Sequence, residues 1–289
     1  PFLRGRDVKR WRVDFDERYL IRIESSENKT HPWSGKSDAE AERIFQETYP
    51  AIHAFMQQHR EQLTERSDQG RYYWELRSCT YWQKFEEPKI ILGIFMNNPT
   101  FTFDRRGFYH NNALHMISGA DQFVTAILNS SPGWWFLRQI STDLQNGFLQ
   151  AYQEKLEQIP IPNAPPATQA LITRLVDYLL FLSAQAQGGP RDALMVPFLE
   201  QLLDALVFEL YLPDALHGAG RRPFDTLSAE AWPDSPSLDE LRALFARLYD
   251  PQHPARKLVF FLDSIPEVRL IMAGARTQVA GAVVADDDE

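Results

Sequence analysis

The sequence has little of what marks secreted, zinc-stapled or membrane proteins. Cys79 is the single cysteine among 289 residues, so no internal disulfide can form, and no Cys/His cluster has the spacing of a structural zinc site. No apolar run reaches the roughly 18 residues of a membrane span, and the N-terminus carries no charged-then-apolar signal peptide. These absences predict a soluble protein of a reducing compartment, the cytoplasm, without membrane association.

Signatures of catalysis are also scarce. Adenine methylation needs a donor-binding loop and an Asn/Asp-Pro-Pro-aromatic loop, and the nearest match, residues 98–101 (NPTF), lacks the second proline and is expected to be a turn. Asp68 with residues 87–89 (EPK) has the loose pattern of a metal-dependent nuclease, which solvated charges produce by chance. His110 and His115 lie five apart in a strand-like segment, hence on opposite faces. We therefore expect no catalytic group, metal site or cofactor in this chain.

The composition is that of a folded globular protein with a local imbalance of charge. Hydrophobic residues make up 44% and charged residues 24%, and the net charge is -9. Residues 1–163 hold 20 basic against 21 acidic residues, whereas residues 164–289 hold 10 against 18. Residues 1–22 alone hold seven basic and four acidic residues. Because binding responds to the field within about a Debye length of ~8–10 Å, the total charge does not exclude DNA as a partner.

The first half of the chain alternates between helical and strand patterns. Apolar side chains recur at helical spacing over residues 50–65, and residues 89–96 (KIILGIFM) form a β-rich apolar run. Residues 100–110 (TFTFDRRGFYH) alternate around a turn that ends in glycine, which predicts a hairpin. Residues 111–117 predict another strand, and residues 121–140 return to helical spacing. This half is predicted to be mixed α and β.

The second half is predicted to be mostly helical. Pro160 and Pro162 in the segment IPIPNAPP remove two backbone donors, so we place a domain boundary after residue 163. The tail, residues 274–289, has small residues and a terminal acidic run, and is expected to be flexible. The fold class is therefore α+β, with a recognition domain over 1–163 and a helical region over 164–289. Two helical stripes of apolar side chains support this: Leu171, Ile172, Leu175, Val176, Leu179 and Leu180, then Leu199, Leu202, Leu203, Leu206 and Leu210.

Residues 70–91 (GRYYWELRSCTYWQKFEEPKII) interleave aromatic rings with cations. Guanidinium and ammonium groups pair with phosphates while aromatic faces stack on bases, so the pattern is typical of a nucleic-acid surface. The other interpretation is that the rings are core residues and the charges are solvated, and we expect this for about half of the rings. The cations of this stretch are the candidates for DNA contact.

Seven short segments follow one another in a recognisable order across the first 163 residues. They are PFLRGRDVKRW, YLI, YPAIHAFMQQHREQLTERSDQGRYYWELR, FEEPKIIL, FTFDRRGFYHNNALHMI, AILNS and LEQIPIP. Together they resemble the TaqI-like C-terminal specificity domain, the target-recognition domain of type IIG restriction-modification enzymes and related adenine-specific DNA methyltransferases. Residues 199–212 (LEQLLDALVFELYL) look like the helix that follows the recognition domain in such enzymes.

The resemblance implies a catalytic domain outside this sequence. In that family a segment similar to LRGRDVKRW joins the methyltransferase domain to the recognition domain, so we expect a chain that starts at Pro1 to be a piece of a longer protein. The parent would transfer a methyl group from S-adenosylmethionine to adenine N6 at a specific DNA site, in restriction-modification or phage defence. A fused nuclease in the parent would add Mg²⁺ as a cofactor. The fragment alone is expected to be non-catalytic, with double-stranded DNA and the parent's methyltransferase domain as partners.

The leading hypothesis is therefore a DNA target-recognition module. Arg105 and Arg106, at the tip of the predicted hairpin, are the candidates to enter the major groove, where a bidentate Arg–guanine contact carries about 1–3 kcal/mol of discrimination. The alternative is a protein-interaction module in which the acidic helical half docks a partner subunit. The other predicted DNA-binding residues are four cations that meet phosphates or base edges and three tyrosines that flank them: Arg71, Arg77, Lys84 and Lys89, with Tyr72, Tyr73 and Tyr81.

Overall fold

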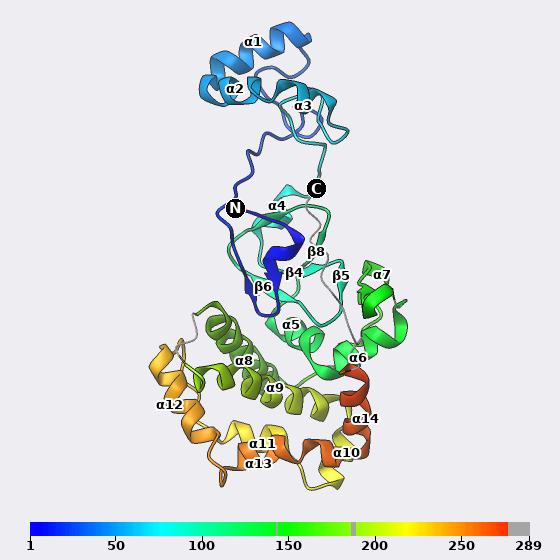
Figure 1. Cartoon of the computed structure of the whole chain (residues 1–289), viewed down its shortest axis with the longest axis vertical. Helices are drawn as coiled ribbons and strands as arrows, with labels where there is room; N and C mark the ends of the chain where they lie inside the picture. The colour runs from blue at the N-terminus through cyan, green and yellow to red at the C-terminus, as the bar shows by residue number, and fades with distance from the viewer. Residues whose placement is uncertain (143, 186–188, 277–289) are drawn as a thin grey trace. The chain divides into compact units, whose positions relative to one another are not determined.

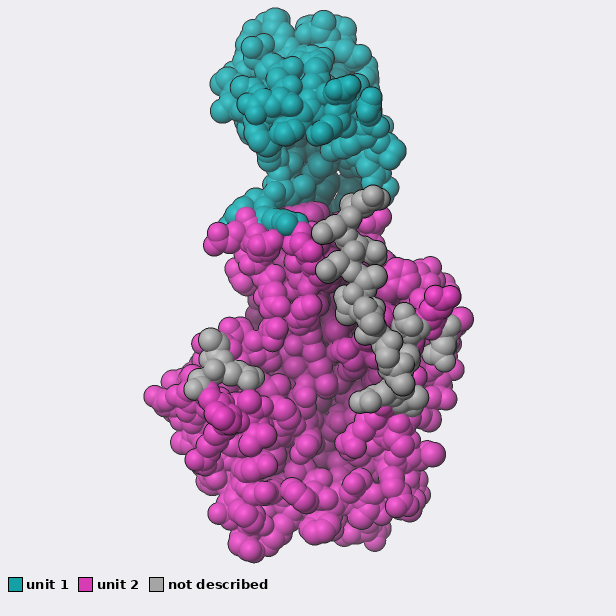
Figure 2. Space-filling view, in the orientation of Figure 1, with its two compact units in different colours: residues 1, 18–86 teal, residues 2–17, 87–289 magenta. Residues whose placement is uncertain are grey.

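The computed structural model describes residues 1–142, 144–185 and 189–276 of the chain (Figure 1). The chain forms two compact units (Figure 2). Unit 1 consists of residues 1 and 18–86, and unit 2 of residues 2–17 and 87–289. Small sheets occur in the first part of the chain, and every regular element described from Pro166 onward is a helix. The predicted fold class, a mixed α/β part followed by a mostly helical half, is confirmed.

Unit 1 is a small helical unit built around an aromatic cluster. The rings of Phe45 and Trp74 stack with centroids 4.8 Å apart, and those of Tyr72 and Trp74 lie 5.0 Å apart. The first helix begins after Ser37, whose side chain accepts a hydrogen bond from the Glu40 N–H. The helices of the unit are α1 (Asp38–Thr48), α2 (Pro50–Gln57), α3 (Arg60–Glu65) and α4 (Trp82–Glu86).

The helix predicted over residues 50–65 is divided into two. Helix α2 begins at Pro50, a residue suited to the first helical position, and the chain turns at Gln58 and His59 before α3. Met56 in α2 and Leu63 in α3 both pack against the same aromatic cluster on the two sides of this break.

The centre of unit 2 is a three-stranded antiparallel sheet. Strand β4 (Lys89–Gly93) lies between β6 (Thr102–Asp104) and β8 (Leu114–Ser118). Ile90 pairs with Phe103 on one side and with Ile117 on the other. The first four residues of β4 are buried, as expected for a central strand. The β-rich run from residue 89 is thus confirmed, and it continues into β5 (Phe95–Met96), which pairs with β9 (Leu149–Gln150).

The predicted hairpin over residues 100–110 is wrong. Strand β6 pairs with β4, whereas β7 (Tyr109–His110) pairs in parallel with β1 (Phe2–Leu3). The two halves of the segment therefore belong to different sheets. A turn after His110 also separates it from His115 in β8, so the two histidines do not share one strand. Local alternation of side chains specifies a strand but not which distant edge completes its hydrogen bonds, and this is why the sequence misled.

The helices of unit 2 follow the predicted stripes. The segment 121–140 forms two helices, divided at Ser130, whose hydroxyl accepts a hydrogen bond from the Gly133 N–H. The later stripes of leucines lie in α8 and α9, as predicted. The helices are α5 (Gln122–Asn129), α6 (Ser131–Ile140), α7 (Gln153–Leu156), α8 (Pro166–Ala184), α9 (Met195–Tyr211), α10 (Pro213–Gly218), α11 (Pro223–Ser228), α12 (Leu238–Leu248), α13 (Pro254–Phe260) and α14 (Pro266–Ala275).

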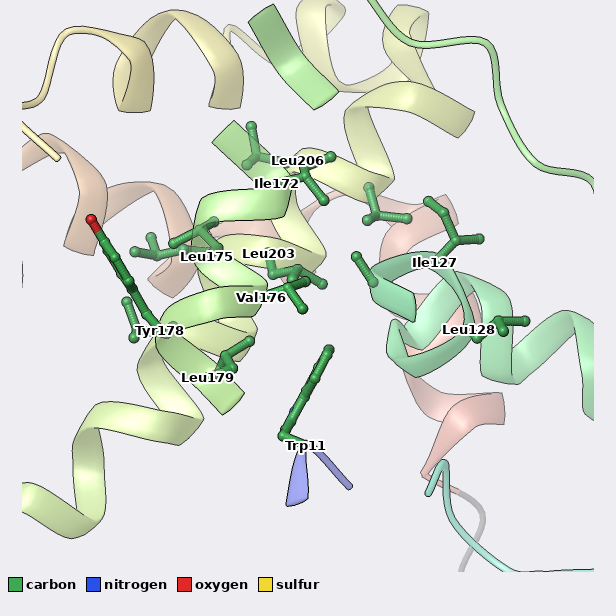
Figure 3. Packing of buried hydrophobic residues seen from close by; sticks show 14 of the residues in the cluster. Trp11, Ile127, Leu128, Ile172, Leu175, Val176, Tyr178, Leu179, Leu203 and Leu206 are labelled. Atoms are coloured by element: carbon green, nitrogen blue, oxygen red, sulfur yellow. The ribbon is translucent and has the colours of Figure 1, made fainter. Parts of the chain in front are cut away.

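A single hydrophobic core joins the sheet of unit 2 to α8 and α9. Trp11 comes from the turn between β2 (Val8–Lys9) and β3 (Arg12–Val13), and Figure 3 shows its ring projecting toward α8. Trp11 is 1% exposed and belongs to the same cluster as Ile90, Val176 and Leu203. The core thus continues across residue 163. The boundary of the recognition domain predicted there stays a prediction.

Two further expectations are the absence of a membrane span and a flexible C-terminal tail. None of the helices formed by the described residues combines the length and the apolar character that a membrane span requires. The tail predicted to be flexible, residues 274–289, lies outside the described residues from position 277 onward.

The shared core predicts the behaviour of a shortened chain. A chain that ends at residue 163 should lose the sharp thermal unfolding of the full chain and bind a hydrophobic dye, because α5 and α6 lose the apolar faces of α8 and α9. Circular dichroism and dye fluorescence on both chains check this. A sharp transition near that of the full chain would show that the first 163 residues fold without the helical half.

Candidate nucleic-acid interface

The aromatic stretch of unit 1 is mainly a loop that leads into α4. Tyr72, Trp74 and Phe85 are buried, Tyr73 and Trp82 are partly buried, and Tyr81 is exposed. The expectation that about half of the six rings belong to the core is therefore confirmed.

Tyr72 is one of the core rings. It is 4% exposed, and its hydroxyl donates to the backbone carbonyl of Lys36 at 2.8 Å. The guanidinium carbon of Arg71 lies 4.8 Å from the centre of its ring. The prediction that Tyr72 itself contacts DNA is wrong, because its ring is enclosed by the aromatic cluster. The ring instead supports the outer face on which Arg71 lies.

Arg71 and Arg77 are exposed on unit 1, each beside an exposed carboxylate. Arg71 Nη2 lies 2.8 Å from Asp38 Oδ1, and Arg77 Nη1 lies 3.2 Å from Asp68 Oδ1. The two carboxylate side chains are 79% and 72% exposed. Exposed ion pairs of this kind contribute only about 0–1 kcal/mol, so a phosphate can replace the carboxylate at little cost. Both arginines are available to a polyanion.

Tyr81 and Lys84 stand at the start of α4 and within it. Tyr81 is 51% exposed, and its ring centre lies 6.0 Å from that of Phe85. Lys84 is exposed in the last turn of the helix. An exposed ring that leans on a buried one has a free face for stacking, and a nearby ammonium group suits a phosphate. The geometry is compatible with the predicted roles of both residues.

Tyr73 belongs to a polar network around Glu42. Its hydroxyl donates to Glu42 Oε1 at 3.1 Å and accepts from Gln57 Nε2 at 2.8 Å, and Arg60 lies 4.6 Å from its ring centre. Hydrogen bonds from Arg60, followed by those from His53 and Tyr73, lower the pKa of Glu42 to about 2 despite partial burial. Burial and the neighbouring Glu42 raise the pKa of Tyr73 to about 12. The hydroxyl of Tyr73 is thus committed to the network, and only its ring is left for contact.

Lys89 is not on a surface. Its side chain is 0% exposed, and its Nζ lies 2.5 Å from Oδ2 of Asp104, whose side chain is 1% exposed. The prediction that Lys89 meets a DNA phosphate is therefore wrong. As the first residue of β4 it faces Asp104 directly across the strand pair. Sequence position beside exposed charges suggested a solvated lysine, whereas the sheet encloses it.

Arg105 and Arg106 occupy a tight turn at the end of β6. Asp104 closes this turn, since its Oδ1 accepts the Arg106 N–H at 2.7 Å and its Oδ2 accepts the Phe108 N–H at 2.9 Å. Gly107 adopts φ 73°, a left-handed conformation that glycine tolerates without strain. The hairpin that was expected to carry the two arginines does not exist, but the turn exposes both of them.

The two guanidinium groups of this turn have different neighbours. Arg105 Nη2 lies 2.9 Å from Asp177 Oδ1 on α8, and both side chains are partly exposed. Arg106 lies 4.8 Å from the ring centre of Phe108 and has no ion pair within the described part of the chain. A flat guanidinium held over a ring keeps its edge available for bidentate hydrogen bonds. Arg106 is therefore the more accessible of the two predicted readers.

Sequence reasoning missed Asp104 and Asp177, because it considered only cations and rings. Asp104 could have been found, since Asp before a short turn that ends in glycine commonly bonds to the backbone that follows. Asp177 lies 72 residues from Arg105 in the sequence, and no local signal links them. Among the described residues, no group of three or more His, Cys, Asp or Glu side chains could hold a metal ion.

The exposed arginines of this chain are typical of the class of nucleic-acid-binding proteins. Exposed arginines commonly contact the phosphates and base edges of nucleic acids, and this chain presents them on the turn after β6 and on the aromatic stretch. The sequence matches the TaqI-like C-terminal specificity domain over residues 1–161, which is more than half of the chain. The chain belongs to this family, whose role is DNA target recognition in restriction-modification enzymes. No curated protein matches the chain.

The Glu42 network predicts a pH-dependent stability of the chain. Because the folded pKa of Glu42 is lowered from 4.5 to about 2, its contribution is complete above pH 4.5 and is lost as the pH falls toward 2. Glu42→Gln should lower the free energy of unfolding by about 1–3 kcal/mol near neutral pH, and this difference should shrink over that acidic window. Denaturant unfolding at a series of pH values measures it.

Glu47 is the matched control, since it forms an exposed i,i+4 pair with Arg43 on the same helix as Glu42. Glu47→Gln should change the free energy of unfolding by no more than a few tenths of a kcal/mol. A Glu42→Gln effect that stayed constant from neutral pH to the acid limit would contradict the assigned network.

Proposed function

We propose that this chain is the target-recognition module of an adenine-N6 DNA methyltransferase that acts in restriction-modification or phage defence. The family membership supports DNA target recognition. The resemblance to adenine-specific methyltransferases is the reason to propose a parent enzyme of that kind. The observation that carries the proposal is the turn after β6, which presents Arg105 and Arg106 from a backbone closed by Asp104.

The turn suits base recognition for a geometric reason. A bidentate contact between arginine and guanine needs the planar guanidinium at a defined distance and angle from the base edge. A turn whose backbone is closed by two hydrogen bonds keeps its side chains nearer to one direction than an open loop does. Two adjacent arginines can address two neighbouring base pairs, or one base pair and a phosphate.

The exposed cations of unit 1 suit phosphate contact instead. Arg71, Arg77 and Lys84 each present a charge at the surface of unit 1, and the carboxylates beside the two arginines are themselves exposed. Phosphate contacts position a duplex without selecting its sequence. The proposal thus divides the predicted residues into base readers on unit 2 and phosphate contacts on unit 1.

The segment that comes nearest to an adenine-binding loop, residues 98–101, does not fit a flipped adenine. In the segment 98–101, Phe101 is fully buried, and its backbone N–H and carbonyl are both bonded to the side chain of Asn129. Asn98 donates its amide to Asn97 Oδ1 at 2.7 Å. A ring enclosed in the core cannot stack on a base. We therefore assign the donor, and Mg²⁺ where a nuclease is fused, to the parent's other domains and derive no methyl transfer here.

The alternative is a module that docks a partner subunit through the acidic helical half. One observation favours it: Phe260, Phe261 and Leu270 expose 65%, 51% and 69% of their surfaces in the last part of unit 2. Large exposed apolar side chains are a feature of surfaces that contact other proteins. In this case the arginine turn would be incidental, and duplex binding separates the two functions.

Salt dependence is the first test of the proposed function. The chain should bind duplex DNA, and the logarithm of its affinity should fall linearly with the logarithm of salt concentration, by about 0.9 for each phosphate contact. Lys84→Ala should reduce this slope by about 1, whereas Arg269→Ala, an exposed cation of α14, should leave it unchanged. Fluorescence anisotropy over a range of salt concentrations measures both. Binding that ignores salt would favour the docking module.

Sequence preference is the second test. In the intact parent enzyme, Arg105→Ala and Arg106→Ala should relax preference at one or two base positions, at a cost of about 1–3 kcal/mol for each lost base contact. Lys84→Ala should weaken methylation of all sites alike, and Arg269→Ala and Arg276→Ala should leave the profile unchanged. Sequencing of the methylated sites reports each profile. A shift caused by the Arg269 and Arg276 variants but not by the turn variants would place the reading surface elsewhere.

A further inference from the structure

The ion pair between Lys89 and Asp104 lies inside the sheet of unit 2. The two residues are direct cross-strand partners at the end of the β4–β6 ladder, with Nζ and Oδ2 2.5 Å apart. Their side chains are 0% and 1% exposed. Removing two charges from water costs several kcal/mol for each ion, which mutual attraction repays only when the remaining hydrogen bonds are also made. The benefit that offsets this cost of burial must therefore be identified.

Asp104 uses both of its carboxylate oxygens. Oδ2 receives Lys89 Nζ and the Phe108 N–H, and Oδ1 receives the Arg106 N–H. Three donors therefore converge on one carboxylate, and two of them are backbone groups of the turn that carries Arg105 and Arg106. The lysine neutralises the charge, and the carboxylate closes the turn.

Stability alone does not account for this arrangement. Replacing a buried ion pair by apolar side chains of similar volume is often neutral or stabilising. An apolar pair, however, has no acceptor for the two N–H groups, so the turn would open toward water. What the pair supplies beyond stability is therefore the conformation of the turn.

The conformation of the turn determines where the side chains of Arg105 and Arg106 lie. Arg106 lies over the ring of Phe108, one of the residues whose N–H is bonded to Asp104. Arg105 lies 5.3 Å from the ring centre of Phe103 and reaches Asp177, which also accepts from Gln122 Nε2 at 3.3 Å. If the backbone between residues 104 and 108 changed its path, both guanidinium groups would leave these supports.

We propose that Lys89 and Asp104 are positioning residues for sequence recognition: they contact no DNA, but they fix the direction from which Arg105 and Arg106 meet base edges. This rests on the proposed function, and it deepens it by naming residues that determine specificity from inside the protein. Preorganised side chains lose less freedom on binding, so their contacts discriminate more strongly between bases.

The test uses the full chain and the double variant K89M/D104N. Both substitutions preserve side-chain shape approximately and remove both charges together, so no buried charge is left unpaired. The asparagine retains one oxygen, so it can accept from only one side of the turn and without charge. Amide hydrogen exchange at Arg106 and Phe108 should become faster by about tenfold or more, as expected when hydrogen bonds to a charged acceptor are lost.

Thr102→Val is the matched control for exchange. Thr102 is buried on the same strand as Asp104 and pairs with Ile91, but it lies outside the turn. Its substitution should leave exchange at Arg106 and Phe108 unchanged. The amide of Ile91, in the centre of the sheet, should exchange at the same rate in the wild-type chain and in both variants.

The second measurement is sequence preference, read by selection from a pool of short randomised duplexes at low salt. The double variant should lose preference at the base positions that Arg105→Ala and Arg106→Ala affect, by about 5-fold or more in relative affinity. Its salt slope should equal that of the wild-type chain, because no phosphate contact is removed. A merely structural defect would weaken binding to all duplexes alike.

The outcomes separate this inference from the proposed function. If the arginine variants change the preference while K89M/D104N changes neither preference nor exchange, or changes exchange alone, the positioning role is overturned and the proposed function stands. If the arginine variants leave the preference unchanged, the assignment of the readers fails whatever the buried pair does. Should the double variant not fold, Asp104→Glu, which keeps a carboxylate for Lys89 but moves its oxygens away from the two turn N–H groups by one methylene, is decided by the same two measurements.

Discussion

The packing of the N-terminal arm and the central sheet against α8 and α9 is the constraint on which unit 2 depends. Trp11 adopts φ 65°, a left-handed conformation that is strained for a tryptophan, yet the residue is almost wholly buried. Its indole N–H donates to Glu200 at 2.6 Å, and Arg10 pairs with the same carboxylate at 2.9 Å. Burial of so large a ring, with its polar atom satisfied, offsets the backbone strain. The turn that holds Trp11 is thereby fixed to the helical half.

This dependence gives the helical half a structural role beside the proposed recognition turn, which its charge does not suggest. Residues 164–289 are strongly acidic, and an acidic surface repels a duplex. Yet α8 supplies Asp177 to Arg105 and, with α9, supplies much of the core beneath the sheet. The helices of this half thus pack against the sheet and reach the turn after β6, whereas the cations proposed to meet DNA belong to other elements. A negative net charge is compatible with the proposed DNA-binding surface on this division of the chain.

Much of the fold was predictable, because hydrophobic periodicity is a local property. The helices α8 and α9, the strand from Lys89 and the pair α5 and α6 all lie where the spacing of apolar residues indicates. The family follows in the same way from short segments in order along the chain, and the match over residues 1–161 confirms it. The hairpin at residues 100–110 failed, since the alternation of side chains specifies a strand but not its partner.

By itself the sequence determined the fold class, the family and the exposure of the arginine turn, because each follows from neighbouring residues or from their order. Only the tertiary structure decided that Lys89 and Tyr72 are buried, although both stand beside exposed cations in the sequence. Burial depends on which distant segments cover a side chain: Asp104 meets Lys89 across 15 residues, and Trp33 and Lys36 meet Tyr72 across 39 and 36. Such contacts form when the chain closes on itself, and no local pattern records them.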